Sequence, residues 1–231
     1  MISKILNSQL TFGSKNSPVK PFKIETTQGA LSVRELSKSN IKASSEFMFD
    51  CLVSSGDDGW DKYKNCDKAT KKHVLSWFNT LTEHCLNKED GNSTVLVAKD
   101  KNNKIKAYFN LQNFDEMDML YKTGLKDAKT GFVQSCYVAS DYRSQKVGEK
   151  ILEKMLPTAN GFFTDILLSA GKQAVTFYQK MGFVPCENIS SESKKVTDFF
   201  MSKPDKDGTV LMYKSINKLE PCWNRLVKLI K

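Results

Sequence analysis

Closely spaced metal ligands are missing from this sequence. It has only two histidines, His73 and His84, and six cysteines, none of which forms a CxxC pair. Zinc sites usually draw on such paired ligands, and two histidines eleven residues apart on a helix are too distant to share one ion, so we expect no metal site. Several cysteines lie inside apolar runs, which predicts reduced, mostly buried thiols and not a disulfide framework.

Long hydrophobic runs are absent as well. No stretch approaches the length that a transmembrane helix needs, and residues 1–21 lack the unbroken apolar segment of a signal peptide. Glycine (12 residues) and proline (6 residues) are too scarce for a collagen-like or low-complexity chain. We therefore expect an ordinary globular protein of the cytoplasm, without a membrane partner.

The 231 residues are enough to bury one good-sized core, and they carry a net charge of +9. The excess is basic at both ends: Lys4, Lys15, Lys20 and Lys23 face no acid in the first 24 residues, and nine Lys or Arg follow from Lys194 onward. Such ends can steer a protein toward RNA or another polyanion. Scattered lysines also serve solubility, and no interleaved aromatic platform accompanies them, which favours this second interpretation.

The patterning predicts three segments. Residues 1–28 lack periodicity and are expected to form a flexible tail, residues 29–216 one domain, and residues 217–231 a helix-like extension. At the start of the domain, residues 30–36 alternate like a strand, and Ser37 or Ser39 is a candidate cap for the helix that follows. A second amphipathic helix is expected over 67–87, and residues 94–99 and 105–111 predict a hairpin.

The second half of the domain alternates strand and helix. Residues 131–139 predict a strand, which leads through residues 140–148 into a helix with one apolar face. The free N–H groups at the start of a helix bind phosphate well, and Arg143 and Lys146 add positive charge there. A buried strand is expected over 162–169, and a short helix over 174–181 that Gly182 closes.

Two segments of this half resemble the signature motifs of the GNAT superfamily of N-acyltransferases. The first is Cys136-Tyr137-Val138 followed by residues 141–148 (DYRSQKVG), and the second is residues 174–183 (AVTFYQKMGF). The resemblance is strong over 130–185, and residues 209–216 resemble the last strand of that fold. It implies an α/β (α+β) domain whose central, mixed but mostly antiparallel, twisted sheet has about six or seven strands flanked by helices.

The resemblance also implies a cosubstrate, acetyl-CoA, and the residues that hold it. In the family, the backbone of a strand bonds the pantetheine arm, and a turn of the form Arg/Gln-x-x-Gly-x-Gly wraps the pyrophosphate. The matching positions here are Cys136, Tyr137, Val138, Arg143, Ser144, Gln145, Lys146, Val147, Gly148, Glu149 and Gly171. Two of them depart from the family pattern, since Lys146 replaces a glycine and Gly171 a frequent asparagine.

Tyr178 corresponds to the family tyrosine that protonates the departing CoA thiolate, and it is the candidate general acid. The alternative is that Tyr178 merely fills the core. For the base, Asp165 is a weak candidate because it is the one carboxylate on its strand, and Asp115, Glu116 and Asp118 are others. No cysteine has an adjacent histidine to activate it, so we expect direct transfer in a ternary complex without an acyl-enzyme.

The acceptor is expected to be a primary amine, either a small molecule or a protein lysine or N-terminus. The acidic residues Glu46, Asp50, Asp57, Asp58 and Asp61, beside Trp60 and Tyr63, would suit a cationic amine. Two alternatives remain: an RNA- or ribosome-associated protein that uses its basic termini, and a degenerate CoA-binding module without catalysis. The sequence fits a monomer or a homodimer.

Overall fold

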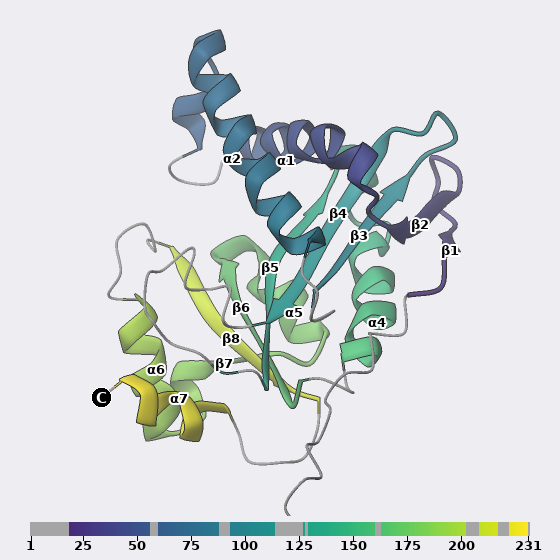
Figure 1. Cartoon of the computed structure of the whole chain (residues 1–231). Helices are drawn as coiled ribbons and strands as arrows, with labels where there is room; N and C mark the ends of the chain where they lie inside the picture. The colour runs from purple at the N-terminus through teal and green to yellow at the C-terminus, as the bar shows by residue number, and fades with distance from the viewer. Residues whose placement is uncertain are drawn as a thin grey trace, which may run out of the picture.

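A computed structural model of the chain describes residues 19–55, 60–87, 93–113, 127, 129–159, 163–201, 208–216 and 222–230. These residues form a single eight-stranded sheet flanked by helices on both faces (Figure 1). The strand order is β1-β2-β3-β4-β5-β6-β8-β7. The strands are β1 (Phe22–Ile24), β2 (Leu31–Glu35), β3 (Thr94–Lys99), β4 (Ile105–Asn113), β5 (Thr130–Val138), β6 (Asp165–Gly171), β7 (Val184–Pro185) and β8 (Thr209–Ser215).

Among the strands of the described residues, only the pair β5–β6 is parallel, and every other neighbouring pair is antiparallel. The α-helices are α1 (Ile41–Ser55), α2 (Lys68–Leu86), α4 (Val147–Ala159), α5 (Val175–Lys180), α6 (Ser191–Met201) and α7 (Cys222–Ile230). The expected fold is therefore confirmed, with two very short edge strands beyond the number predicted.

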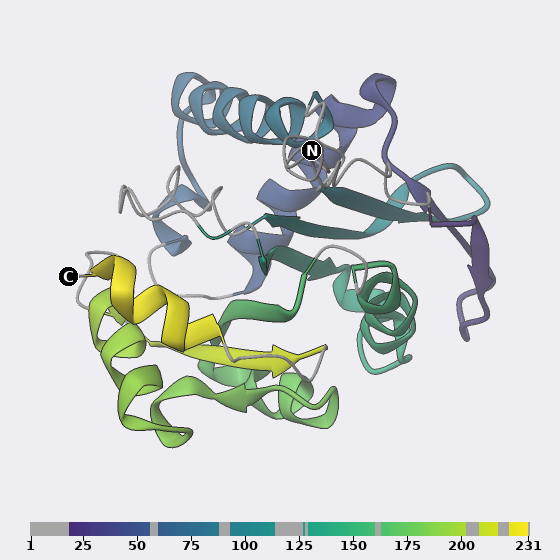
Figure 2. The same cartoon turned by 60° about the horizontal axis from the view of Figure 1, so that its bottom comes forward.

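The helices divide between the two faces of the sheet (Figures 1 and 2). On one face, α4 and α5 cover the main core, where side chains of alternate strand residues meet those of α4: Phe109, Val133, Ile166 and Met212 with Ile151 and Leu152. On the other face, α1 and α2 cover β3 and β4, while α6 and α7 cover β6 and β8. Because successive strand residues point to opposite faces, both layers draw on the same strands.

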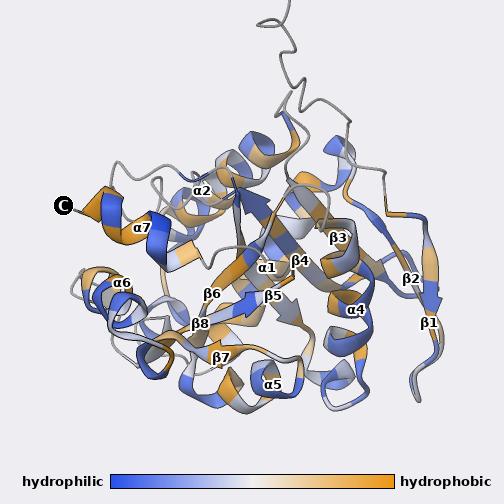
Figure 3. Ribbon diagram, turned by 90° about the horizontal axis from the view of Figure 1, so that it is seen from below, coloured by the Kyte–Doolittle hydropathy of each residue, from blue (hydrophilic) through white to orange (hydrophobic). Residues whose placement is uncertain are grey.

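Hydropathy follows this layering. The helices in Figure 3 carry apolar residues toward the sheet and polar residues outward. In α4 the residues Ile151, Leu152 and Met155 are fully buried, as their 3.6-residue spacing predicts. Among the helices of the described ranges, none has both the length and the hydropathy needed to cross a bilayer.

Helix starts show where local prediction succeeded and failed. Asp67 caps α2 by accepting a hydrogen bond from the Thr70 N–H at 2.9 Å, and this bond lowers the pKa of the Asp67 carboxyl. The expected serine cap of α1 is wrong. A 3-10 turn (Lys38–Asn40) precedes α1, and the Ser37 hydroxyl, which makes no capping bond, instead lies 2.9 Å from the Ser39 hydroxyl.

Ordered structure also begins before residue 29. Strand β1 lies inside the segment expected to be a flexible tail, and its Phe22 and Ile24 pair with Val33 and Leu31 of β2. Ile24 is almost fully buried, so this hairpin belongs to the core. Residues 1–18 of the predicted tail lie outside the described part of the chain. The predicted C-terminal extension contains α7, whose Trp223 and Leu226 are buried against the sheet layer.

Candidate acyl-CoA site

The sheet opens between β5 and β6. These two parallel strands pair from Thr130↔Asp165 to Val133↔Leu168, and beyond that point β5 continues beside β4 while β6 continues beside β8. An extra residue in β5 contributes to the opening: Leu111 pairs with Val133 but Asn110 pairs with Ser135, so Gln134 forms a β-bulge. A bulge bends its strand. Residues 134–138 of β5 therefore face no neighbouring described strand on one side.

Two residues of β5 turn their backbone groups toward this opening. The Ala139 N–H donates to the Lys106 carbonyl at 2.9 Å, which makes 106 and 139 a hydrogen-bonded pair. Such pairs alternate in an antiparallel ladder, so Val138 and Cys136, opposite Ala107 and Phe109, direct their N–H and C=O groups away from β4. The Val138 carbonyl accordingly accepts a hydrogen bond from Arg143 Nε at 3.2 Å. The open edge can bond an extended ligand.

A tight turn follows β5 and leads into α4. After the 3-10 turn Ser140–Tyr142, Arg143 is extended, and both Ser144 and Lys146 have positive φ angles, 61° and 59°. This region favours glycine because it crowds a Cβ atom. The turn thus has the backbone shape for which the family uses glycine, and Lys146 adopts it with a full side chain.

Side-chain hydrogen bonds and an ion pair stabilise the turn. Gln145 Nε2 donates to the Asp141 carbonyl at 2.8 Å, and Gln145 Oε1 accepts from the Thr27 N–H at 2.8 Å and the Thr27 hydroxyl at 2.9 Å. Lys106 forms an ion pair with Asp141 at 3.1 Å. The side chains of Arg143 and Gln145 are thus used to hold the turn itself. Thr27, on the β1–β2 hairpin, was missed from the sequence because it lies in the predicted tail.

Helix α4 begins directly after the turn, at Val147. The Lys146 carbonyl accepts from the Lys150 N–H at 3.0 Å, so the N–H groups of Val147, Gly148 and Glu149 precede the first helical hydrogen bond. Unused N–H groups and the positive end of the helix dipole form an anion site. A Cβ on Gly148 would lie 3.2 Å from Phe177 Cζ and 3.6 Å from Phe109 Cζ. Gly148 therefore serves close packing against α5 and β4.

The conformation of Lys146 predicts a measurable strain. Lys146→Gly should raise the free energy of unfolding by about 1 kcal/mol, since a left-handed residue with a side chain costs roughly 1–2 kcal/mol and the freer unfolded glycine chain offsets part of the gain. Thermal unfolding measures it. Lys150→Gly, inside α4, is the matched control and should destabilise by about 1 kcal/mol. Equal destabilisation by both variants would contradict the strained turn.

Tyr178 of α5 lies beside the open edge of β5. Tyr178 is 7% exposed, and the Cys136 thiol is close enough to affect its pKa. Gly182, with a φ of 81°, ends α5, and the Phe183 N–H donates back to the Tyr178 carbonyl at 3.0 Å, so that the two rings pack edge to face at 5.8 Å. The predicted C-terminal glycine is confirmed.

Burial keeps both side chains protonated. It raises the pKa of Tyr178 well above its ordinary value, and the neighbouring Cys136 adds to this shift. Burial also raises the pKa of Cys136 to about 12, opposed by the hydrogen bond from Tyr178. At neutral pH the pair is therefore a phenol and a thiol, so Tyr178 can supply a proton while Cys136 is a poor nucleophile.

Asp165 lies at the other end of β6 from the opening. Its carboxylate is fully buried and accepts hydrogen bonds from the Tyr213 hydroxyl at 2.6 Å and the Thr164 hydroxyl at 2.5 Å, and it pairs with Arg225 of α7 at 3.3 Å. Asp165 therefore does not face water. The structure does not bring Asp165 together with Tyr178, and its contacts are those of a group that ties α7 to the sheet.

Gly171, by contrast, ends β6 at the same end as the opening, where it pairs with Thr209. In the described part of the chain no three His, Cys, Asp or Glu side chains group as metal ligands. All six cysteines are described, and none is in a disulfide.

A cavity of about 140 Å³ lies on the opposite face of β5, under α1 and α2. The bulged segment of β5 contributes Gln134, Ser135 and Tyr137 to its wall, and the full set of lining residues is Met48, Leu52, Trp60, Trp77, Phe78, Leu81, Thr82, Tyr108, Asn110, Gln134, Ser135 and Tyr137. Trp60 stacks on Phe78 with ring centroids 5.8 Å apart and also contacts Tyr63 at 5.2 Å. Of the two residues of the expected aromatic wall, Trp60 lines the cavity and Tyr63 does not.

The acids expected near this cavity do not line it. Glu46, Asp50 and Asp61 are all exposed, and Asp50 lies 4.0 Å from Lys71. The candidates Asp57, Asp58, Asp115, Glu116 and Asp118 lie outside the described residues. His73 and His84 are exposed on α2, as expected of surface residues.

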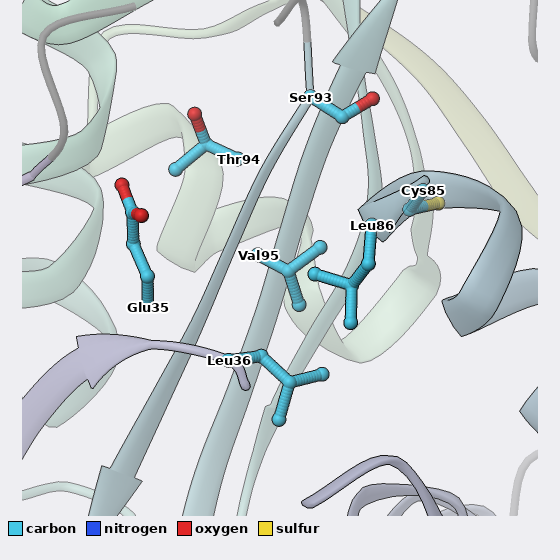
Figure 4. A pocket seen from close by; sticks show the side chains of 7 residues that line it. All are labelled: Glu35, Leu36, Cys85, Leu86, Ser93, Thr94 and Val95. Carbon is cyan, nitrogen blue, oxygen red and sulfur yellow. The ribbon is translucent and has the colours of Figure 1, made fainter. Parts of the chain in front are cut away.

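A second hollow, of about 160 Å³, lies where the end of α2 meets the start of β3 (Figure 4). Its lining includes Glu35, Cys85 and Ser93, and Glu35 Oε1 accepts a hydrogen bond from the Val19 N–H at 3.0 Å. Strand β4 separates β3 from β5, so this hollow is remote from the opening of the sheet.

Comparison with known proteins agrees with this geometry. Residues 91–185 match the family model of the acetyltransferase (GNAT) domain. An acetyltransferase of the GNAT family from Staphylococcus aureus Mu50 is 16% identical, with a TM-score of 0.52 over 81% of this chain and 99% of the other. The GNAT domain of PAT from S. lividans is 11% identical, with a TM-score of 0.53 over 85% and 97%.

These two structures support the fold, and none of the curated proteins compared with the chain matches it. The matched segment runs from the residues just before β3 to β7 and includes the opened strand pair, the turn and Tyr178. Residues 91–185 of the chain therefore match a GNAT acetyltransferase domain.

Proposed function

We propose that the protein is an N-acetyltransferase that moves an acetyl group from acetyl-CoA to a primary amine by direct transfer. The observation that carries the proposal is the burial of Tyr178 beside Cys136, at the edge where β5 parts from β6. A proton donor there lies beside an edge suited to an extended arm, and the phosphate-binding turn begins two residues after that edge ends.

The cosubstrate would be held largely by backbone. The pantetheine arm pairs with the outward N–H and C=O groups of Cys136 and with the carbonyl of Val138. The pyrophosphate accepts hydrogen bonds from the N–H groups of Val147, Gly148 and Glu149 at the start of α4, with the Lys146 ammonium as an added point charge. Because backbone groups supply most of these contacts, the site tolerates the Lys146 side chain at a position where the family has glycine.

The chemistry follows from these positions. The neutral amine attacks the thioester carbonyl, the developing oxyanion accepts a hydrogen bond from the Val138 N–H, and the carbon–sulfur bond then breaks. Tyr178 gives its proton to the leaving thiolate, the amine nitrogen loses one proton to solvent, and the phenolate takes one proton from solvent, which restores the phenol. The products are an N-substituted acetamide and CoA with a free thiol.

Direct transfer predicts that Cys136 is dispensable for turnover. Cys136→Ala should keep kcat within about tenfold of the wild type, because it removes one hydrogen bond to Tyr178 and no nucleophile. Wild type incubated with acetyl-CoA alone should keep its unmodified mass in mass spectrometry. A protein mass raised by one acetyl group at Cys136, together with a loss of several orders of magnitude in Cys136→Ala, would contradict direct transfer.

Release of free CoA tests the proposal as a whole. Purified protein is incubated with acetyl-CoA and each of a panel of amines, and the free thiol of CoA is measured with a chromogenic disulfide. We expect CoA to be released only when an acceptor amine is present. Binding of acetyl-CoA without release for any amine would indicate the degenerate module. Lack of acetyl-CoA binding combined with steeply salt-dependent RNA binding would favour the RNA-associated alternative.

A further inference from the structure

The described residues that line the cavity under α1 and α2 are all uncharged. None of its twelve described lining residues is Asp, Glu, Lys, Arg or His. A cationic ligand in such a space would lose its hydration without gaining a counter-charge. The cavity therefore favours a ligand that is neutral when it binds.

Its size and walls suit one aromatic ring. An engineered cavity of about 150 Å³ with apolar walls binds benzene, and the present cavity of about 140 Å³ is comparable. Five of the lining residues are aromatic: Trp60, Trp77, Phe78, Tyr108 and Tyr137. Rings of this kind prefer offset or edge-to-face neighbours, which gives a bound ring a defined orientation.

One buried amide in the wall has an unused acceptor. Asn110 is 2% exposed, and its Nδ2 donates to Gln134 Oε1 at 2.7 Å and to Cys85 Sγ at 3.3 Å. These two bonds set the orientation of the amide, and Asn110 Oδ1 has no hydrogen-bond partner in the described part of the chain. A buried acceptor without a partner is costly unless a ligand or water donates to it. An amino N–H is the matching donor.

The reaction also favours an amine that is neutral at pH 7. An attacking amine must be neutral, and an alkylamine such as lysine, with a pKa of about 10.4, is protonated at pH 7. The candidate base Asp165 is not in the cavity and already has three partners. An aromatic amine needs no base, because delocalisation of its lone pair into the ring keeps it neutral at pH 7.

We propose that this cavity takes a primary aromatic amine of the aniline type, with its ring among the aromatic side chains and an amino N–H donated to Asn110 Oδ1. The inference rests on the proposed acetyl transfer. The wall residues Ser135 and Tyr137 flank Cys136 on β5, so an amine at this wall lies beside the edge at which the thioester would be held.

Steady-state assays with acetyl-CoA and three amines test the proposal: 4-methylaniline, benzylamine and spermidine. At pH 7 we expect kcat/KM for 4-methylaniline to exceed that for spermidine by at least about tenfold, since spermidine must lose a proton and its hydration. Between pH 6.5 and 8.5 the value for 4-methylaniline should stay nearly constant, and that for benzylamine should rise by about tenfold per pH unit as its neutral fraction grows.

Two variants of Asn110 separate recognition from packing. Asn110→Asp places a carboxylate in the same shape, so we expect kcat/KM to fall about three- to tenfold for 4-methylaniline and to rise for benzylamine. Asn110→Leu should lower kcat/KM for 4-methylaniline without raising kcat/KM for benzylamine. Thermal unfolding checks that both variants are folded, and acetyl-CoA titration checks that the other site is intact.

The remaining outcomes overturn either the aromatic-amine inference or the proposed function. Wild-type preference for spermidine or benzylamine at pH 7, with acetyl-CoA bound and consumed, overturns the aromatic-amine inference and leaves acetyl transfer standing. An equal fall of kcat/KM for 4-methylaniline and for benzylamine in the two Asn110 variants also overturns the aromatic-amine inference, because that result indicates a packing role of Asn110. Failure to bind acetyl-CoA at all overturns the proposed function and this inference with it.

Discussion

Tyr178→Phe should lower kcat by about 10²- to 10⁴-fold, the contribution expected of a positioned general acid. The Kd for acetyl-CoA should stay within about threefold, because in the proposed mechanism the lost hydroxyl would contact the leaving sulfur and not the phosphates. Burial raises the pKa of Tyr178 well above its ordinary value, so the phenol should remain protonated to at least pH 9. The wild-type rate should therefore show no decline between pH 7 and 9 from this group.

The matched control is Tyr63→Phe, which removes a phenol hydroxyl from a half-buried ring that lines neither site. It should leave kcat unchanged. If Tyr178→Phe retained full turnover while its melting temperature shifted, Tyr178 would be a core residue only, as the packing alternative holds. A large loss of acetyl-CoA affinity in Tyr178→Phe would likewise contradict the role of an acid.

Asp165→Ala should lower the free energy of unfolding by about 3 kcal/mol. The substitution removes the acceptor of two buried hydroxyls and one of the two carboxylates that pair with Arg225, and breaking such buried pairs is strongly destabilising. Chemical denaturation measures the change. Asp127, at 3.2 Å from Arg225, still compensates the guanidinium and limits the loss.

Asp165→Asn separates a structural role of Asp165 from a catalytic one, because the amide keeps the shape of the side chain and its oxygen still accepts one hydrogen bond. It should destabilise less than the alanine variant, and the folded enzyme should keep its kcat within about twofold, since Asp165 is remote from the opened strands. A folded Asp165→Asn enzyme that lost most of its activity, with the acid limb of its pH profile removed, would restore Asp165 as the base.

Periodicity predicted the middle of the fold well. The hairpin β3–β4 and helices α2 and α4 combine strong alternation or a 3.6-residue apolar stripe with clear turn chemistry, so local sequence determines them. Strands β1 and β7 have three and two residues, which is too short for any period, and they exist because an edge of the sheet is available. Helix α6 did carry a signal: Ser190 and Ser193 cap it reciprocally at 2.8 and 3.0 Å.

The site depended on resemblance more than on periodicity. Nothing local in the sequence says that Tyr178 meets Cys136, or that the hairpin residue Thr27 braces Gln145, because both contacts join distant segments. The same holds for Asp165, whose partner Arg225 follows in a helix that no motif marked. The strain at Lys146 was foreseeable only as a missing glycine, and its φ of 59° gives that departure a physical meaning.

The most direct test of the account is a calorimetric titration of the protein with acetyl-CoA, beside a Lys146→Glu variant. The account predicts one site per chain in the wild type and a Kd raised about ten- to a hundredfold in the variant, because a charge-assisted phosphate contact becomes a repulsion. Absence of binding by the folded wild type, or equal binding by both proteins, would contradict the placement of acetyl-CoA at this turn.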